Sequence, residues 1–218
     1  MIEAGELIVK SYLKRVEGCK IVETNWNFFG NKDTIKNNED VKKIGEKYKK
    51  NTAIVNIFDN EKGNLKDFDS LLDKSLLNQI EIDVVGYSNE NGYILSEVAM
   101  HTKGLNYGSN GDTLKKIERK LLKLVILMIG YFQTSKNEKG KIIFFAIKSL
   151  SKDKREILEG FVKELNINIE QLGYKIKVYL MIGEEFQDNY KELKQKIGEK
   201  SSNDFERIIN IDNVLINK

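Results

Sequence analysis

Two short apolar segments joined by a turn-rich stretch constrain the fold of this chain more than any other feature. Residues 80–86 (IEIDVVG) and 93–101 (YILSEVAMH) have the pattern of β-strands, and SNENG between them favours a reverse turn. The sequence therefore predicts an antiparallel hairpin. Because apolar residues occur on both faces of the two strands, we expect the sheet to be covered on both sides.

Helices and strands alternate in the rest of the chain. Residues 3–17 have apolar side chains at helical spacing, and Gly18 stands where a glycine commonly ends a helix. The pattern further predicts strands at 20–26, 141–148 and 174–182 and helices at 113–132, 152–165 and 184–197. This order favours an α/β fold with a mixed central sheet flanked by helices.

The length of 218 residues favours a single domain, which we place at residues 1–218. Residues 27–79 are the least regular part, and a short helix near 41–48 and a strand at 53–58 are expected there. We interpret this part as an insertion or an edge subregion. We expect residues 183–218 to form a C-terminal extension.

The composition excludes several kinds of site. One Cys leaves no intramolecular disulfide, and one His with one Cys leaves no Cys/His zinc site. Any histidine-based triad would have to use His101.

The net charge of +3 permits nucleic acid as a partner without arguing for it. The longest apolar run, 124–129, is far shorter than the roughly 20 residues of a membrane span. Because MIEAGELIVK lacks the regions of a secretory signal, we expect a cytoplasmic protein without a membrane partner.

Two carboxylates are placed opposite each other in the predicted hairpin. If the turn centres on Glu90, Asp83 faces Glu97 and Val85 faces Leu95. Directly opposite side chains on one face have Cβ atoms roughly 4.5–5.5 Å apart. Two ionised carboxylates at that distance repel each other, so the pair needs a proton, a cation or solvent. Mg²⁺ is bound by oxygen pairs of this kind, together with water and substrate phosphate.

A solvated polar face is the alternative interpretation of the same residues. Gln79, Glu81 and Asp83 alternate along the first strand, and carboxylates on strands are usually exposed. The register places Glu81 opposite Ala99, which makes Glu81 a further acidic residue near the pair.

Two more glutamates lie close to apolar helix faces. In the helix 113–132, Glu118 falls in the middle of the apolar stripe, where a charge needs a partner or a polar pocket. One interpretation directs Glu118 toward Asp83 and Glu97, and the other is an ordinary salt bridge near the helix start. Glu6 lies at the border of the apolar face of the first helix and is a weaker candidate.

These residues also match a family. A helix with Glu6, the strand KIVETNW, a strand EIDVVG with Asp83, a strand YILSEVA with Glu97 and a following helix resemble the PD-(D/E)xK, or restriction-endonuclease-like, nuclease superfamily. The opening AGELIVKSYLKRVEGCKIVETNW is similar to the start of its Holliday-junction-resolvase-like branch. The resemblance covers 3–26 and 80–148. It implies an αβββαβ core, a phosphodiesterase that depends on Mg²⁺ (or Mn²⁺), and metal ligands at Asp83 and Glu97.

The chain departs from the motif of that superfamily at two positions. Ile82 stands where the motif has Pro, and Ala99 stands where it has the Lys that positions or activates the attacking water. Members of the superfamily can supply this Lys from the helix after the third strand. The candidates to replace it here are His101, Lys103, Lys116 and Lys120. The last two flank the polar side of their helix, where a surface position is the default.

The loop HTKGLNYGSNGD is a candidate phosphate-binding segment. Its glycines allow close backbone approach, and its polar side chains include Lys103, Asn106, Tyr107 and Ser109. A simple connector between hairpin and helix is the alternative. The basic run Lys115, Lys116, Arg119, Lys120 and Lys123 has the two corresponding interpretations, a phosphate-facing surface or a solvated helix face.

These observations favour a metal-dependent DNA endonuclease, with DNA as partner and a homodimer as an option for cutting two strands. Two alternatives stay open. Ala99 motivates a nuclease-fold protein that binds nucleic acid without cutting it, and the weak net charge motivates a structural or regulatory protein-interaction domain.

Overall fold

The structure is a computed structural model that describes residues 3–27, 32–49, 81–99, 113–132 and 135–198. Its helices are α1 (Ala4–Arg15), α2 (Lys32–Lys36), α3 (Glu39–Lys49), α6 (Thr113–Leu127), α7 (Lys152–Gln171) and α8 (Glu184–Gly198), with the π-helical turn η2 (Met128–Phe132) continuing α6. Its strands are β1 (Ile21–Asn27), β2 (Glu81–Ser88), β3 (Gly92–Ala99), β4 (Lys139–Ala146) and β5 (Lys175–Ile182). Within these ranges, no helix combines the length and the apolar character that crossing a bilayer requires.

Each element expected from the sequence in these ranges is present, and α7 continues past residue 165 to Gln171. The strand expected at 53–58 lies outside the described residues. α1 begins with a reciprocal capping box between Glu3 and Glu6. Gly18 follows α1 with a φ of 67°, a left-handed conformation that glycine adopts at no steric cost.

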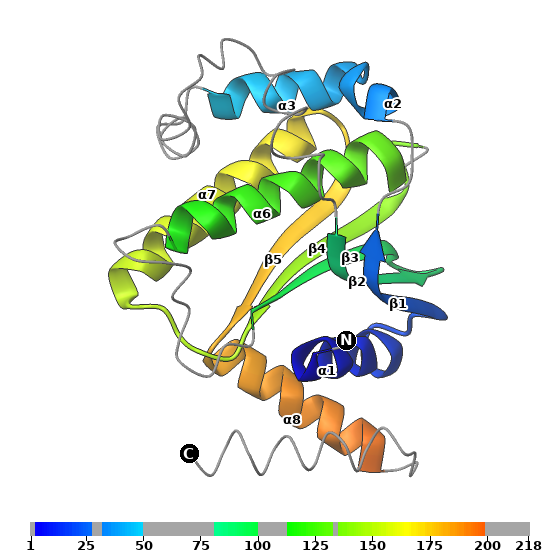
Figure 1. Cartoon of the computed structure of the whole chain (residues 1–218), viewed down its shortest axis with the longest axis vertical. Coiled ribbons are helices and arrows are strands. Elements are labelled where there is room, and N and C mark those ends of the chain that lie inside the picture. The colour runs from blue at the N-terminus through cyan, green and yellow to red at the C-terminus, as the bar shows by residue number, and fades with distance from the viewer. Residues whose placement is uncertain (1–2, 28–31, 50–80, 100–112, 133–134, 199–218) are drawn as a thin grey trace.

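The five strands form one mixed sheet in the order β1-β2-β3-β4-β5. β1, β2 and β3 are antiparallel neighbours, whereas β3, β4 and β5 are parallel and are connected through α6 and α7. Helices cover both faces, with α6 and α7 on one side and α1 and α8 on the other (Figure 1). The predicted α/β class with a mixed central sheet is confirmed at this level.

The register of the hairpin agrees with a turn centred on Glu90. Val85 pairs with Leu95 and Val84 pairs with Ser96. Val85 and Leu95 belong to the larger core, which we call the α6-side core because it also contains the buried residues of α6 and α7. Val84 instead belongs to the smaller α1-side core, which α1 and α8 complete. Alternate residues of the same strand are therefore buried on opposite faces of the sheet.

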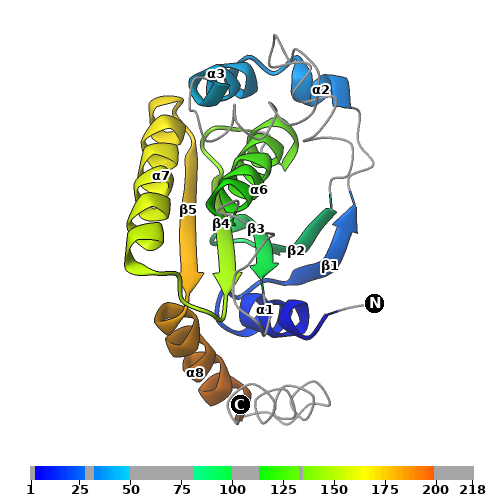
Figure 2. The same cartoon turned by 60° about the vertical axis from the view of Figure 1, so that its left-hand side comes forward.

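β2 and β3 separate at one end of the hairpin. Their pairing ends at Val84 and Ser96, although β2 continues beside β1 as far as Glu81 and β3 continues beside β4 as far as Ala99. β1 and β2 accordingly turn away from the direction of the parallel strands (Figure 2). The position of the split is decisive for the site, because the next residues along these strands are the two predicted metal ligands.

A residue with an unusual backbone conformation lies in β1 at the level of the split. Asn25 has a φ of 52°, which few residue types other than glycine tolerate as well as asparagine does. Near this residue the alternation of faces changes: Val84 is buried in the α1-side core, whereas Ile82 and Trp26 pack in the α6-side core. A regular strand would place Val84 and Ile82 on the same face.

The described part of residues 27–79, chiefly residues 32–49, belongs to the main core. α2 and α3 lie above α6 and α7 (Figure 1). They contribute four buried side chains to the α6-side core: Ile35, Val41, Ile44 and Tyr48. The Nδ2 of Asn168 in α7 donates to the hydroxyl of Tyr48 at 2.8 Å. Residues 32–49 therefore pack in the main core of the domain.

Candidate functional site

Asp83 and Glu97 lie where β2 and β3 separate. The backbone N–H of Val98 donates to Oδ2 of Asp83 at 2.7 Å, so the Asp83 side chain reaches across to β3 beyond the last paired residues. The side chain of Glu97 is only 1% exposed. Burial and, next, the carboxylate of Glu97 raise the pKa of Asp83 to about 6. The two carboxylates therefore act on each other in a desolvated environment.

Two lysines of α6 bind Glu97. Lys123 Nζ donates to Oε1 of Glu97 at 2.7 Å and to the backbone carbonyl of Glu81 at 2.9 Å, whereas Lys120 donates to Oε2 of Glu97. Residues three apart on a helix lie on the same side, so α6 presents both ammonium groups to one carboxylate. Lys120 thus lies beside the predicted metal ligands Asp83 and Glu97, although its place on the helix favoured a surface position.

Ala99 occupies the position at which the resemblance expects a lysine. Its side chain is buried in the α6-side core, and it pairs with Ala146 of β4. A buried methyl group leaves no charged group at this point of the strand. The charge opposite the carboxylates comes instead from the helix that packs on this face of the sheet.

Glu6 of α1 lies close to Glu81, the acidic residue of β2 that precedes Asp83. It is buried, one oxygen accepts a hydrogen bond from the backbone N–H of Glu3 at 3.2 Å, and its side chain also bonds with Asn25. Burial is the main cause that raises the pKa of Glu6, and the carboxylate of Glu81 contributes. Glu6 and the exposed Glu81, which comes two residues before Asp83 in β2, therefore interact with each other.

The structure corrects the interpretation that directed Glu118 toward the carboxylate pair. Glu118 is 4% exposed, and the charged groups that act on its pKa are Lys115 on the same helix and Glu164 on α7. Because Glu118 and Lys120 are about 200° apart around a helix with 3.6 residues per turn, they do not face one point. α6 directs Lys120 to the sheet and Glu118 toward α7.

The remaining predicted residues are either exposed or outside the described part. Lys116 is an exposed residue of α6. The segment 100–112 lies outside the described residues, and with it His101, Lys103, Asn106, Tyr107 and Ser109.

The carboxylate pair fits Mg²⁺ in the kind and number of its ligands. Among the residues that the structure describes, no group of three or more His, Cys, Asp or Glu side chains is placed to hold a metal ion. Mg²⁺, however, is commonly bound through one or two carboxylates, with water and substrate phosphate as the other ligands. The raised pKa of Asp83 marks a pair whose repulsion a cation would relieve. A cation that binds Glu97 would compete with the ammonium groups of Lys120 and Lys123 for this carboxylate.

Lys123 is the residue of this site that the sequence argument missed as a site residue. It was placed only in the basic run of α6, as a phosphate-facing or solvated side chain. Its spacing of three residues from Lys120 was the available signal, because that spacing keeps two side chains on one face. The spacing alone does not show which carboxylate of the sheet contacts this face of α6.

No family model, curated protein or solved structure matches this chain. The class of protein is therefore argued from the fold and from the site alone.

Proposed function

We propose that this protein is a magnesium-dependent phosphodiesterase that cuts DNA. The observation that carries the proposal is the constellation at the split between β2 and β3, where the carboxylates of Asp83 and Glu97 interact and Lys120 of α6 binds Glu97. In this proposal Asp83 and Glu97 hold the cation, and Lys120 takes the role that the resemblance expects at Ala99.

The topology supports a restriction-endonuclease-like core. Apart from α2 and α3, which are inserted between β1 and β2, the elements α1, β1 to β3, α6 and β4 follow in the order αβββαβ that the resemblance implies. The pair of carboxylates belongs to the second and third of these strands, as the motif requires. Because a fold by itself does not fix an activity, the side chains carry the argument.

Each residue of the site has a separate task in the proposed reaction. Asp83 and Glu97 would hold a divalent cation, which would supply an activated water and stabilise negative charge on the phosphate. Lys123 is 13% exposed and is tied to the Glu81 carbonyl, so it positions Glu97. The Lys120 side chain is 33% exposed, so it is the lysine that the proposal assigns to the phosphate of the substrate.

Cleavage of plasmid and branched DNA tests the proposal. The purified chain is expected to cut in Mg²⁺ or Mn²⁺ and not in EDTA. Asp83→Asn is expected to abolish cleavage, and Lys120→Met to slow it roughly 100-fold or more, the scale of a lost proton-transfer or charge-stabilising group. Lys152→Met, which removes an exposed lysine of α7, is the matched control and is expected to cut at the parental rate.

The proposal fails if the folded parent does not cut, or if Asp83→Asn cuts at the same rate. Circular dichroism verifies that the variants are folded. Because Asn is the size of Asp and removes a like-charge contact, Asp83→Asn is expected to retain its structure.

DNA binding without cleavage is the second candidate function. Ala99 and the double neutralisation of Glu97 by lysines favour it. It predicts salt-sensitive DNA binding that survives Asp83→Asn, measured by fluorescence anisotropy without a divalent cation. Absence of DNA binding even at low salt would instead favour a structural or regulatory domain.

A further inference from the structure

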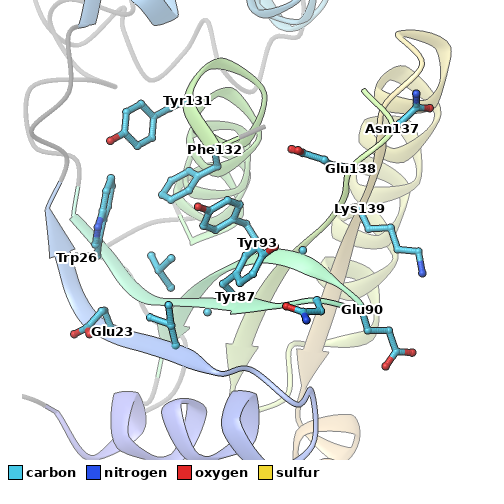
Figure 3. A pocket seen from close by; sticks show the side chains of 15 residues that line it. Glu23, Trp26, Tyr87, Glu90, Tyr93, Tyr131, Phe132, Asn137, Glu138 and Lys139 are labelled. Carbon is cyan, nitrogen blue, oxygen red and sulfur yellow. The ribbon is translucent and has the colours of Figure 1, made fainter. Parts of the chain in front are cut away.

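An aromatic groove lies on the sheet beside β1. Its volume is about 1180 Å³, and its walls come from β1, from both strands of the hairpin, from the end of η2 and from the segment before β4. Figure 3 shows the aromatic side chains gathered above the sheet. The rings are those of Trp26, Tyr87, Tyr93, Tyr131 and Phe132.

These rings form one continuous row. Ring centroids are 4.9 Å apart for Tyr87 and Tyr93, 5.0 Å for Tyr93 and Phe132, and 5.0 Å for Phe132 and Trp26. Phe132 is buried under the others, whereas Tyr87 is 37% and Tyr131 44% exposed. The row thus presents aromatic surface to a ligand while its inner rings are held by the core.

Acidic side chains dominate the charge around the row. Glu23, Glu90 and Glu138 line the groove and are exposed, against the single lysine Lys139. Figure 3 shows Glu138 directed toward the rings, whereas Glu90 and Lys139 are directed away from them. Carboxylates repel a phosphate backbone and attract a cation, and aromatic faces bind ammonium and guanidinium groups.

The groove is large enough to hold a short segment of peptide. Pockets for small molecules are usually about 300–1,000 Å³, and this groove is larger. The lining extends over β1, β2 and β3, so a segment in the groove lies across the face of the sheet and is held through its side chains.

We propose that this groove binds a basic, extended segment of a partner protein, with a Lys or Arg side chain on the aromatic row and its charge facing the carboxylates. This interaction is separate from the proposed phosphodiesterase site, since its lining does not include Asp83 or Glu97.

Trp26 makes the proposal directly measurable, because it is the only Trp of the chain and lies in the groove. The full chain is titrated with an acetylated peptide of alternating Gly and Arg residues, and Trp emission is recorded. A matched peptide with Glu in place of Arg and an oligothymidine are titrated in parallel. The Arg peptide is expected to give a saturable change, and the other two none.

Two groove variants and two controls locate the binding. Tyr131→Ala and Glu138→Gln are each expected to weaken binding of the Arg peptide about fivefold, the scale of one cation–aromatic or charge contact. Tyr179→Ala and Glu170→Gln make the same chemical changes at the other side of the molecule, on exposed residues of β5 and α7. Both control variants are expected to leave the midpoint of the titration with the Arg peptide unchanged.

Several results would overturn the proposal. These are a missing response to the Arg peptide, an equal response to the Glu peptide, or equal weakening by the control variants. A saturable response to oligothymidine alone would assign the groove to nucleic acid instead. Asp83→Asn is expected to bind the Arg peptide normally, so a failure of the phosphodiesterase proposal leaves this test intact.

Discussion

At the scale of single residues, the buried charge of Glu97 organises the site. A carboxylate that is 1% exposed is unstable without charged partners, and α6 supplies two. The two partners are not equivalent. Lys123 is largely buried and makes two hydrogen bonds, whereas Lys120 is one-third exposed.

This difference predicts unequal costs for removing the two lysines. Lys123→Met is expected to lower the free energy of unfolding by about 1–3 kcal/mol, because it leaves a buried carboxylate and a carbonyl with fewer donors. Lys120→Met is expected to cost less, since a more exposed ion pair is screened by solvent. Urea unfolding measures both.

A double-mutant cycle tests whether Lys123 stabilises the fold through its ion pair with Glu97. In the Glu97→Gln background the cost of Lys123→Met is expected to shrink, because the charge that Lys123 neutralises is gone. An unchanged cost in that background would show that the ion pair does not stabilise the fold.

Glu118 shows the opposite situation, a buried carboxylate with poor compensation. Its Oε2 is buried and has no hydrogen-bond partner in the described part of the chain, and burial raises its pKa to about 7. The folded state therefore holds the proton more tightly than the unfolded state, whose pKa is near the ordinary 4.5. The contribution of Glu118 to the free energy of unfolding is most favourable below pH 4.5 and is lost as the pH rises to about 7.

Glu118→Gln is accordingly expected to stabilise the protein at pH 8, on the order of 2 kcal/mol, and to have little effect near pH 5. Urea unfolding of parent and variant at both pH values measures the difference. Glu156→Gln, an exposed position of α7, is the control and should show no pH-dependent difference. A Glu118→Gln effect that is equal at both pH values would contradict the assigned titration.

At the scale of elements, the hairpin depends on close packing at its turn. Gly92 begins β3 with a φ of 67°, and a Cβ atom added there would lie 1.9 Å from the backbone carbonyl oxygen of Lys139. Neither strand can move away easily, because β3 pairs with β4 along its length. The turn therefore requires glycine for space as well as for conformation.

Gly92→Ala is expected to lower the free energy of unfolding by about 3 kcal/mol or more, through strain and displacement of β4. Gly18→Ala is the matched control, because Gly18 has the same φ of 67° but nothing within 4 Å of an added Cβ. It is expected to cost about 1 kcal/mol, the conformational part alone. Equal costs in thermal or urea unfolding would show that the contact at residue 92 relaxes without penalty.

At the scale of the whole molecule, two cores lie on opposite faces of one sheet, and α3 is built into the larger one. Ile44 and Tyr48 are each 1% exposed there. The part of residues 27–79 that the structure describes is thus expected to unfold together with the sheet and not as a separate unit.

Ile44→Ala tests this integration. It is expected to lower the free energy of unfolding of the entire domain by roughly 2–4 kcal/mol, the usual cost of such a cavity. Circular dichroism and Trp26 fluorescence should report the same shifted transition. A separate early transition in circular dichroism, with Trp26 unaffected, would mean that α3 unfolds independently.

Local patterns determined much of this protein. Apolar periodicity identified the described strands and the described helices other than α2, and the turn-rich SNENG determined the hairpin register that places Asp83 near Glu97. Such features depend on residues close in sequence, so they can be inferred without a partner element.

Tertiary packing decided the rest. A helical wheel shows which residues of α6 share a side, but the rotation of α6 against the sheet decides that Lys120 and Lys123 meet Glu97 while Glu118 faces α7. The same holds for the aromatic groove, whose rings come from β1, the hairpin and η2. The physical reason is that the packing of side chains distant in sequence sets how elements are oriented, and periodicity within one element does not contain that information.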